Sequence, residues 1–184
     1  MKKTQWYKDA VCYQIWPRSF CDGNGDGIGD LEGVLSKLDY LQELGINCIW
    51  FSPLYCSPNA DMGYDISDYR NISPDYGDNE LFKKVLDEAH KRGIRVIMDL
   101  VVNHTSDEHE WFKQGIDKNS KYHEYYHWRD GKARRIPTTG LPFLKARHGN
   151  TMSRTVSIIC TFSQRNSPTL KWKIPKSAEK SRKL

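Results

Sequence analysis

The sequence predicts an α/β fold built on a parallel sheet. Three short apolar runs of strand type lie at residues 11–15, 46–51 and 94–102, and segments with apolar residues at helical spacing separate them, at 31–44 and 81–89. Buried strands that alternate with helices are typical of a parallel sheet covered by helices. An open doubly wound sheet and a (β/α)8 barrel both fit this pattern. In either fold the chemistry gathers at the carboxyl ends of the strands.

Each predicted element carries a start or stop signal. Asp30 is a suitable N-cap for the first helix, and Gly45 ends it. Ser52-Pro53 ends the second strand, and Gly93 ends the second helix before the third strand. The same order of helix, glycine and buried strand therefore occurs twice.

The composition excludes several classes of protein. The chain has 184 residues and a net charge of +5, and no apolar run approaches the roughly 18 residues that a membrane span needs. Its N-terminus lacks the apolar stretch of a secretory signal. Five cysteines form no CxxC pair, which argues against a zinc ribbon or a disulfide scaffold and favours a cytoplasmic location. No membrane partner is expected.

The charge is unevenly distributed along the chain. Residues 1–132 carry 16 basic and 22 acidic side chains, whereas residues 133–184 carry 12 basic side chains and a single acid, Glu179. Such a basic tail fits either a nucleic-acid-binding extension or a segment unrelated to the preceding domain. It does not interleave aromatic with basic residues as a stacking platform would. Nucleic-acid binding is therefore the weakest of the functional hypotheses.

A loop rich in glycine and aspartate precedes the first predicted helix. It places oxygen donors at alternate positions, a pattern that matches much of a calcium-loop template: Asp22, Asn24, Asp26, the Ile28 carbonyl and Asp30. Gly33 stands where the usual bidentate glutamate would be, so the loop is not an EF-hand. The sequence predicts a hard-cation site here; the alternative is a turn that only caps the helix.

Polar side chains follow the second and third predicted strands. Tyr64 and Asp65 pair an aromatic ring with a carboxylate, a combination that suits a sugar: the ring stacks on a pyranose face and the carboxylate accepts hydroxyl hydrogen bonds. Asp99, Asn103 and His104 bring a carboxylate, an amide and an imidazole to the end of the third strand. A solvated loop over a packed tyrosine and a structural histidine are the alternatives to a binding site.

Other signals are absent or point to packing. The sequence shows no Ser-His-Asp nucleophile arrangement, no phosphate-cradling glycine loop and no redox cysteine motif. The aromatic stretch 122–128 is expected to pack within an excursion after the third strand, with a wall of a substrate cleft as the alternative.

Together, these motifs resemble the start of a glycoside hydrolase of family 13. The resemblance rests on Tyr13–Phe20, Asp22–Asp30, Gly63–Ile66 and Asp99–His109, in order and at matching spacing across residues 5–132. The subgroup that it resembles contains oligo-1,6-glucosidases, α-glucosidases, dextran glucosidases and trehalose-6-phosphate hydrolases.

The resemblance implies a (β/α)8 barrel with a small domain inserted after its third strand. It implies that Tyr64 stacks on glucose, that Asp65 and His104 bind its hydroxyls, and that Asp99 and Asn103 support the site. The loop Asp22–Asp30 would hold a structural Ca²⁺, or alternatively Mg²⁺. The implied activity is retaining hydrolysis of α-glucosidic bonds in short oligosaccharides, by an aspartate nucleophile and a glutamate acid/base. Both belong to later strands in the family, so no residue of this chain is assigned a catalytic role.

We therefore expect residues 1–104 to form the first part of an incomplete barrel, with about three of its strands, and residues 105–136 to begin the inserted domain. Residues 137–184 are expected to be an out-of-frame, non-native tail. The chain alone is expected to be inactive. A non-catalytic sugar- or calcium-binding fragment is the alternative, and the oligomeric state cannot be read from the sequence.

The tail hypothesis comes from regrouping the codons. If the third base of each codon is read with the first two of the next, residues 147–153 allow Ala-Trp-Glu-Tyr-Asp-Glu, a string expected next in this family. Sequencing the encoding DNA tests the hypothesis. We expect an insertion or deletion between the codons for Lys132 and Pro137 whose correction restores the family sequence, and an intact downstream frame would contradict it.

Overall fold

The structure is a computed structural model that describes residues 5–130, 149–151 and 157–160. The chain divides into two compact units, Met1–Val101 and Val102–Leu184, and each is described by itself. The predicted boundary between barrel and inserted domain, at residues 104 and 105, stays a prediction. Within the described residues, no helix is long and apolar enough to cross a membrane.

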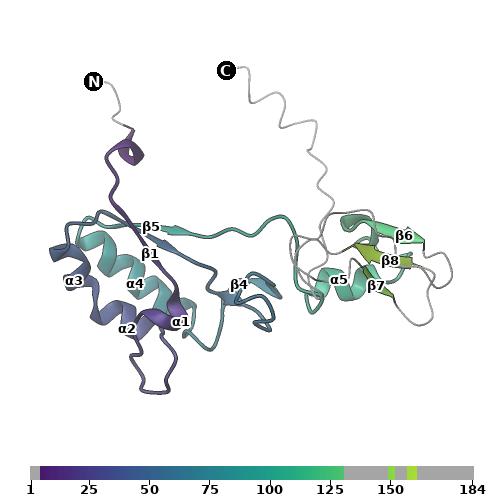
Figure 1. The fold of residues 1–184 in the computed structure, drawn as a ribbon, viewed down its shortest axis with the longest axis horizontal. Helices are drawn as coiled ribbons and strands as arrows, with labels where there is room; N and C mark the ends of the chain where they lie inside the picture. Colours follow the sequence, from purple (N-terminus) through teal and green to yellow (C-terminus); the bar gives the residue numbers. More distant parts are fainter. Residues whose placement is uncertain (1–4, 131–148, 152–156, 161–184) are drawn as a thin grey trace. The chain divides into compact units, whose positions relative to one another are not determined.

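The first unit is built on a parallel sheet of three strands, β1 (Cys12–Ile15), β2 (Cys48–Phe51) and β5 (Arg95–Met98). Their order is β1-β2-β5, so the middle strand pairs with both others (Figure 1). The register joins Ile15 to Phe51 and Phe51 to Met98, which brings the carboxyl ends of all three strands to one edge. The predicted parallel α/β arrangement is confirmed.

Helices connect the strands: α1 (Pro17–Phe20), α2 (Leu31–Ser36), α3 (Leu38–Glu43) and α4 (Asn79–Lys91). Asp30 caps α2 as predicted, and its carboxylate accepts a hydrogen bond from the Gly33 amide at 2.6 Å. The helix predicted over 31–44 is divided in two, because Lys37 leaves the helical conformation with φ −105° and ψ 5°. Gly45 and Gly93 follow α3 and α4 with φ of 83° and 71°, a conformation that glycine adopts without strain.

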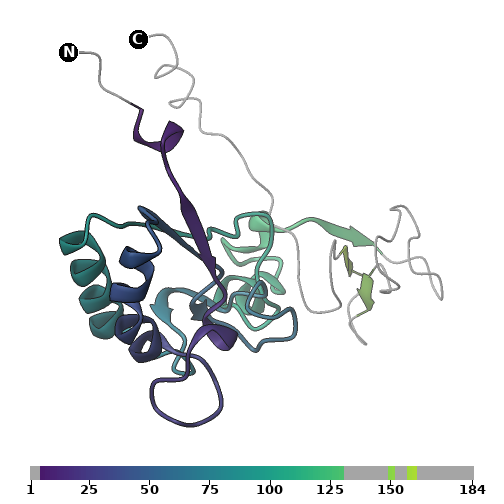
Figure 2. The same cartoon turned by 60° about the vertical axis from the view of Figure 1, so that its left-hand side comes forward.

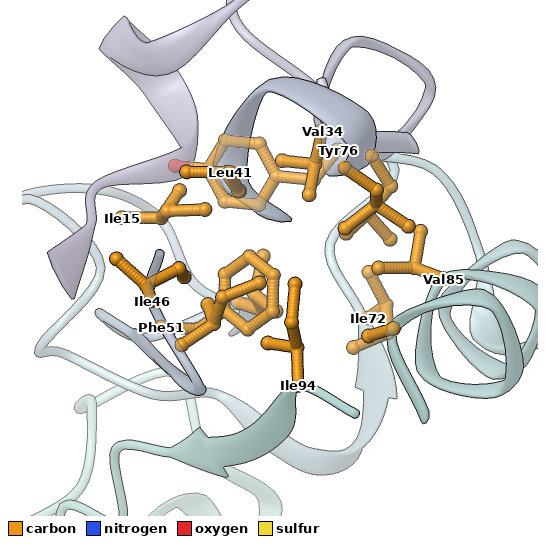
Figure 3. Packing of buried hydrophobic residues seen from close by; sticks show 14 residues of the cluster. Ile15, Val34, Leu41, Ile46, Phe51, Ile72, Tyr76, Val85 and Ile94 are labelled. Carbon is orange, nitrogen blue, oxygen red and sulfur yellow. The ribbon is translucent and has the colours of Figure 1, made fainter. Parts of the chain in front are cut away.

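One face of the sheet packs against α2, α3 and α4 (Figures 1 and 2). Side chains from strands and helices interdigitate in a single core, of which Figure 3 labels Ile15, Val34, Leu41, Ile46, Phe51, Ile72, Tyr76, Val85 and Ile94. On the strands the opposite face carries Gln14, Trp50 and Ile97, which are exposed in the described part of the chain. Helices on a single face are what a barrel requires, whereas a doubly wound sheet has them on both.

A small antiparallel hairpin, which the sequence analysis missed, interrupts the connection between β2 and α4. It consists of β3 (Tyr55–Cys56) and β4 (Asp68–Ile72), with a register shift between Tyr55 and Cys56. The strands themselves are shorter than the apolar runs that predicted them, since β5 ends at Met98 rather than at residue 102. A short 3-10 helix, η1 (Trp6–Lys8), precedes β1.

The second unit contains α5 (Glu110–Gly115), η2 (His123–Tyr125) and an antiparallel sheet in the order β6-β8-β7. Its strands are β6 (Trp128–Asp130), β7 (Gly149–Thr151) and β8 (Ser157–Cys160). Apart from β7 and β8, the segment 137–184 predicted to be out of frame lies outside the described residues.

Candidate functional site

The carboxyl ends of the three parallel strands hold a group of polar side chains. The Ser52 amide donates to the Ile15 carbonyl and the Asp99 amide to the Phe51 carbonyl, both at 3.0 Å. The Gln14 side-chain amide donates to the Ser52 hydroxyl at 3.2 Å. Backbone pairing between the strands therefore continues to Ser52 after β2 and to Asp99 after β5. This pairing sets the positions of the Cα atoms from which the Ser52 and Asp99 side chains extend.

Tyr64 reaches this edge from the loop after β3. Its hydroxyl donates a hydrogen bond to Oδ2 of Asp99 at 3.2 Å. Burial raises the pKa of Tyr64, and the negative charges of Asp99 and Asp61 raise it further, while a hydrogen bond with Ser52 acts in the opposite direction. The phenol therefore keeps its proton at neutral pH. The structure brings together Tyr64 and Asp99, two of the residues that the sequence predicted.

Asp65 holds the loop that carries Tyr64. Its side chain is fully buried, and its carboxylate accepts hydrogen bonds from the Ser57 hydroxyl at 2.7 Å, the Ala60 amide at 2.9 Å and the Asp61 amide at 3.0 Å. Oδ1 accepts two of these bonds and Oδ2 accepts one, so the carboxylate is held from both oxygens. The predicted sugar contact of Asp65 stays a prediction, and its observed partners belong to its own loop.

Asp61 is a residue that the sequence analysis missed. Its carboxylate is close enough to the Tyr64 phenol to raise the pKa of that group, and its side chain is half-buried. The chain between them turns through positive φ, 53° at Met62 and 96° at Gly63, and the Tyr64 amide donates to the Asp61 carbonyl at 3.0 Å. Gly63 was the only signal of this turn, and residue types alone did not distinguish Asp61 from Asp65.

Asn103 and His104 belong to the second unit. The side-chain amide of Asn103 lies 3.2 Å from Nδ1 of His104, whose ring is buried. Next to them the hydroxyls of Thr105 and Tyr126 share a hydrogen bond at 2.9 Å. Burial raises the pKa of Tyr126 to about 12, although the bond to Thr105 acts against it. The predicted role of Asn103 and His104 in binding a sugar stays a prediction.

The aromatic stretch 122–128 packs as expected. Phe112 and Tyr126 form the buried centre of a small core, and their rings meet edge to face at 5.2 Å between centroids. Trp128 stacks on Phe112 at 5.8 Å and on His123 at 4.8 Å. These contacts agree with packing rather than with an open cleft wall.

The Asp22–Asp30 loop is held by its own backbone. Both oxygens of Asp22 accept amide hydrogen bonds, from Gly25 at 2.6 Å and Gly27 at 2.8 Å, and these bonds lower the pKa of Asp22. Asp26 accepts from the Ile28 amide, and the Asn24 side-chain oxygen accepts from the Asp26 amide. Asp30 is buried and also accepts from the amides of Gly23 and Asn24. These hydrogen bonds are those of a turn that caps α2.

The fit of a cation to this loop is incomplete. The donors are oxygens of the kind that Ca²⁺ prefers. Within the residues that the structure describes, however, no three acidic, histidine or cysteine side chains gather closely enough to hold a metal ion. The predicted cation stays a prediction.

Comparison with known proteins identifies the family. Residues 14–177 match the family model "Alpha amylase, catalytic domain". The chain belongs to the alpha-amylase family. Its parallel strands and their helices are accordingly part of a (β/α)8 barrel. The match continues past residue 137, into the segment predicted to be out of frame.

Several curated relatives are oligo-1,6-glucosidases. The chain is 55% identical over 140 residues to the probable oligo-1,6-glucosidase 2 of Bacillus subtilis strain 168, covering 76% of this chain and 25% of that protein. It is 48% identical over 172 residues to the oligo-1,6-glucosidase of Parageobacillus thermoglucosidasius, covering 93% of this chain and 31% of that protein. The chain thus spans about a quarter to a third of the length of these relatives.

Solved structures of two synthases are also similar. The isomaltulose synthase of Klebsiella sp. LX3 has a TM-score of 0.89 and 46% identity, over 97% of this chain and 32% of that chain. A trehalulose synthase, MutB, has a TM-score of 0.88 and 46% identity, over 95% of this chain and 32% of that chain.

Asp65→Asn should destabilise the first unit, because the new amide NH2 group would face donors that need an acceptor. We expect the free energy of unfolding in urea to fall by about 2–3 kcal/mol. Asp61→Asn is the matched control: it makes the same chemical change in the same loop at a half-buried side chain, and should change stability by less than about 0.5 kcal/mol. Equal losses in the two variants would contradict the structural role of Asp65.

Proposed function

We propose that the protein containing this chain hydrolyses α-glucosidic linkages in short oligosaccharides, as an oligo-1,6-glucosidase. The observation that carries the proposal is the Tyr64–Asp99 hydrogen bond at the carboxyl ends of barrel strands. Active sites of such barrels lie at that edge. The oligo-1,6-glucosidase relatives support the choice of reaction.

In this proposal Tyr64 forms the floor of a glucose site. Its ring would stack on the apolar face of the sugar, and the hydrogen bond to Asp99 would fix the tilt of the ring. Asp61 and Asp99 would accept hydrogen bonds from sugar hydroxyls, because both carboxylates lie close enough to the Tyr64 phenol to raise its pKa. His104 is proposed as a further hydroxyl ligand, and Asn103 as a residue that supports the site, as the family resemblance implies. We assign neither the nucleophile nor the general acid to a residue of this chain.

A synthase that transfers a glucosyl group rather than hydrolysing it is the second candidate. Similarity to isomaltulose and trehalulose synthases favours it, and one MutB structure contains sucrose as substrate. Hydrolysis remains the better proposal because the oligo-1,6-glucosidase of Heyndrickxia coagulans is 60% identical over 130 residues. A dextran glucosidase, a trehalose-6-phosphate hydrolase and a non-catalytic sugar-binding fragment are the remaining alternatives. The cytoplasmic location and the absence of nucleic-acid and membrane partners stay predictions of the sequence.

Product analysis of the full-length gene product tests the reaction. We expect glucose from isomaltose, and no isomaltulose or trehalulose from sucrose. Tyr64→Ala should lower kcat/KM about 100-fold, whereas Tyr64→Phe, which keeps the ring, should lose about tenfold or less. Tyr40→Ala is the control, since Tyr40 lies exposed on α3.

Three results discriminate among the alternatives. Conversion of sucrose to its isomers would favour the synthase, and release of glucose 6-phosphate from phosphorylated trehalose would favour the trehalose-6-phosphate hydrolase. Full activity of Tyr64→Ala would contradict the site itself. The 184-residue chain, assayed in parallel, should bind glucose without turnover.

We also propose that the Asp22–Asp30 loop binds Ca²⁺ as a structural ion, on the strength of its oxygen donors alone. Calorimetric titration of the metal-free protein should give one site, which Asp26→Ala removes and Asp75→Ala, at an exposed carboxylate outside the loop, leaves intact. Absence of binding heat in the unmodified protein would reject the proposal.

A further inference from the structure

Three polar side chains from neighbouring strands share the helix-free face of the parallel sheet. Gln14 of β1 is the register partner of Trp50 in β2, and Trp50 is the partner of Ile97 in β5. Side chains alternate between the two faces of a strand, so Ser52 lies on the face of Trp50. Asp99 lies on the face of Ile97 for the same reason. In a (β/α)8 barrel the helix-free face is the interior, so all three side chains belong to the inside of the barrel, at its carboxyl end.

Hydrogen bonds through Tyr64 join these side chains in a row. The Gln14 side-chain amide donates to the Ser52 hydroxyl at 3.2 Å. Ser52 is also a hydrogen-bond partner of the Tyr64 phenol. The Tyr64 hydroxyl in turn donates to Oδ2 of Asp99 at 3.2 Å. The row therefore runs without a break from β1 to the residue that follows β5.

The protons of this row have a single direction. A carboxylate only accepts hydrogen bonds, so the one proton of the Tyr64 hydroxyl is used toward Asp99. The Tyr64 oxygen must then accept from Ser52, whose own oxygen accepts from Gln14. A donor to the phenol oxygen stabilises the phenolate, and the Ser52 bond does lower the pKa of Tyr64, whereas burial, the largest influence, raises it. Every proton in the row is thus donated in the direction of Asp99.

The first two members of the row are held by the sheet. Ser52 is only 6% exposed, and its backbone amide donates to the Ile15 carbonyl at 3.0 Å. Gln14 lies within β1. Tyr64, in contrast, belongs to a loop, and a side chain on a loop is positioned less precisely than one on a strand. Bonds to Ser52 and Asp99 hold its hydroxyl between two neighbouring strands.

We propose that Ser52 and Gln14 are positioning residues for Tyr64, which fix the direction in which its hydroxyl donates and thereby the tilt of its ring. The relevance of that tilt to a sugar rests on the proposed function, whereas the direction of the hydrogen bonds is a property of the row itself. Hydrogen bonds in such a row polarise and strengthen one another, so the effect of Gln14 reaches Tyr64 through Ser52.

Ser52 variants of the full-length protein test the donor to Tyr64. Ser52→Ala should lower kcat/KM for isomaltose about fivefold, the size expected for one neutral hydrogen bond. Ser52→Thr keeps the hydroxyl and should retain at least about half of the activity. Ser73→Ala is the matched control, because Ser73 is equally buried but its hydroxyl accepts from the Asp75 amide of its own loop at 3.4 Å. It should leave kcat/KM unchanged.

Gln14 variants test the direction of the row. The carboxylate of Gln14→Glu has the same size but cannot donate, so the Ser52 proton would turn toward it and leave Tyr64 without a donor. We expect a loss of about fivefold at neutral pH, which disappears as the pH falls toward the ordinary glutamate pKa of about 4.3 and the protonated carboxyl donates again. Gln14→Met removes the partner of Ser52 without reversing its bond, and should lose less than about twofold. Gln42→Glu, an exposed position on α3, is the control and should add no pH dependence.

The same substitutions in a Tyr64→Phe background separate positioning from other effects. Phenylalanine has no hydroxyl to orient, so Ser52→Ala and Gln14→Glu should cause no further loss of kcat/KM in this background. A general structural role of Ser52, or a direct effect of the new charge at position 14 on the substrate, would instead persist.

NMR titration of tyrosine labelled with a carbon isotope at Cζ gives a readout that needs no activity. The signal that Tyr64→Phe lacks belongs to Tyr64. It should titrate at higher pH in Ser52→Ala than in the unmodified protein, because a donor to the phenolate is lost, and should be unchanged in Ser73→Ala.

Failure of the inference and failure of the proposed function give different results. An unmodified protein that does not hydrolyse isomaltose would reject the function, and the titration of Tyr64 would still decide the direction of the row. Full activity of both Ser52→Ala and Gln14→Glu, equal losses with and without the Tyr64 hydroxyl, or an unchanged Tyr64 titration in Ser52→Ala would each overturn the inference.

Discussion

The parallel register of β1, β2 and β5 determines which side chains meet at the carboxyl edge of the sheet. Because Ile15, Phe51 and Met98 are aligned, the residues that follow them arrive at one edge, where Asp99 meets Tyr64. A shift by one residue would turn each side chain to the other face of the sheet.

The acidic side chains near these edges differ in what they bind. Asp30 and Asp65 are buried, and each accepts hydrogen bonds from backbone amides of its own loop. Asp99 instead accepts a hydrogen bond from a side chain, and Asp61 acts on the same phenol through its charge. Buried carboxylates that satisfy loop amides set the path of the chain. Asp61 and Asp99 are half-buried, and they are the carboxylates that we propose for ligand binding.

Much of the first unit could be predicted from the sequence, because apolar periodicity and glycine stops are local signals. The strands, the cap at Asp30 and the turns at Gly45 and Gly93 were found in this way. The break at Lys37 was missed, since no proline or glycine marks it. Which of Asp61 and Asp65 lies beside the Tyr64 phenol depends on the backbone turn with positive φ at Met62 and Gly63. Residue types do not specify that turn.

A crystal structure of the full-length protein with bound glucose would test the central claim most directly, that Tyr64 with Asp61 and Asp99 forms the sugar site. We expect the ring of Tyr64 to lie against the apolar face of the sugar, with sugar hydroxyls bound to Asp61 or Asp99 and Asp65 still bound to the amides of Ala60 and Asp61. Glucose bound elsewhere, or bound to Asp65 with those amide hydrogen bonds broken, would contradict the account.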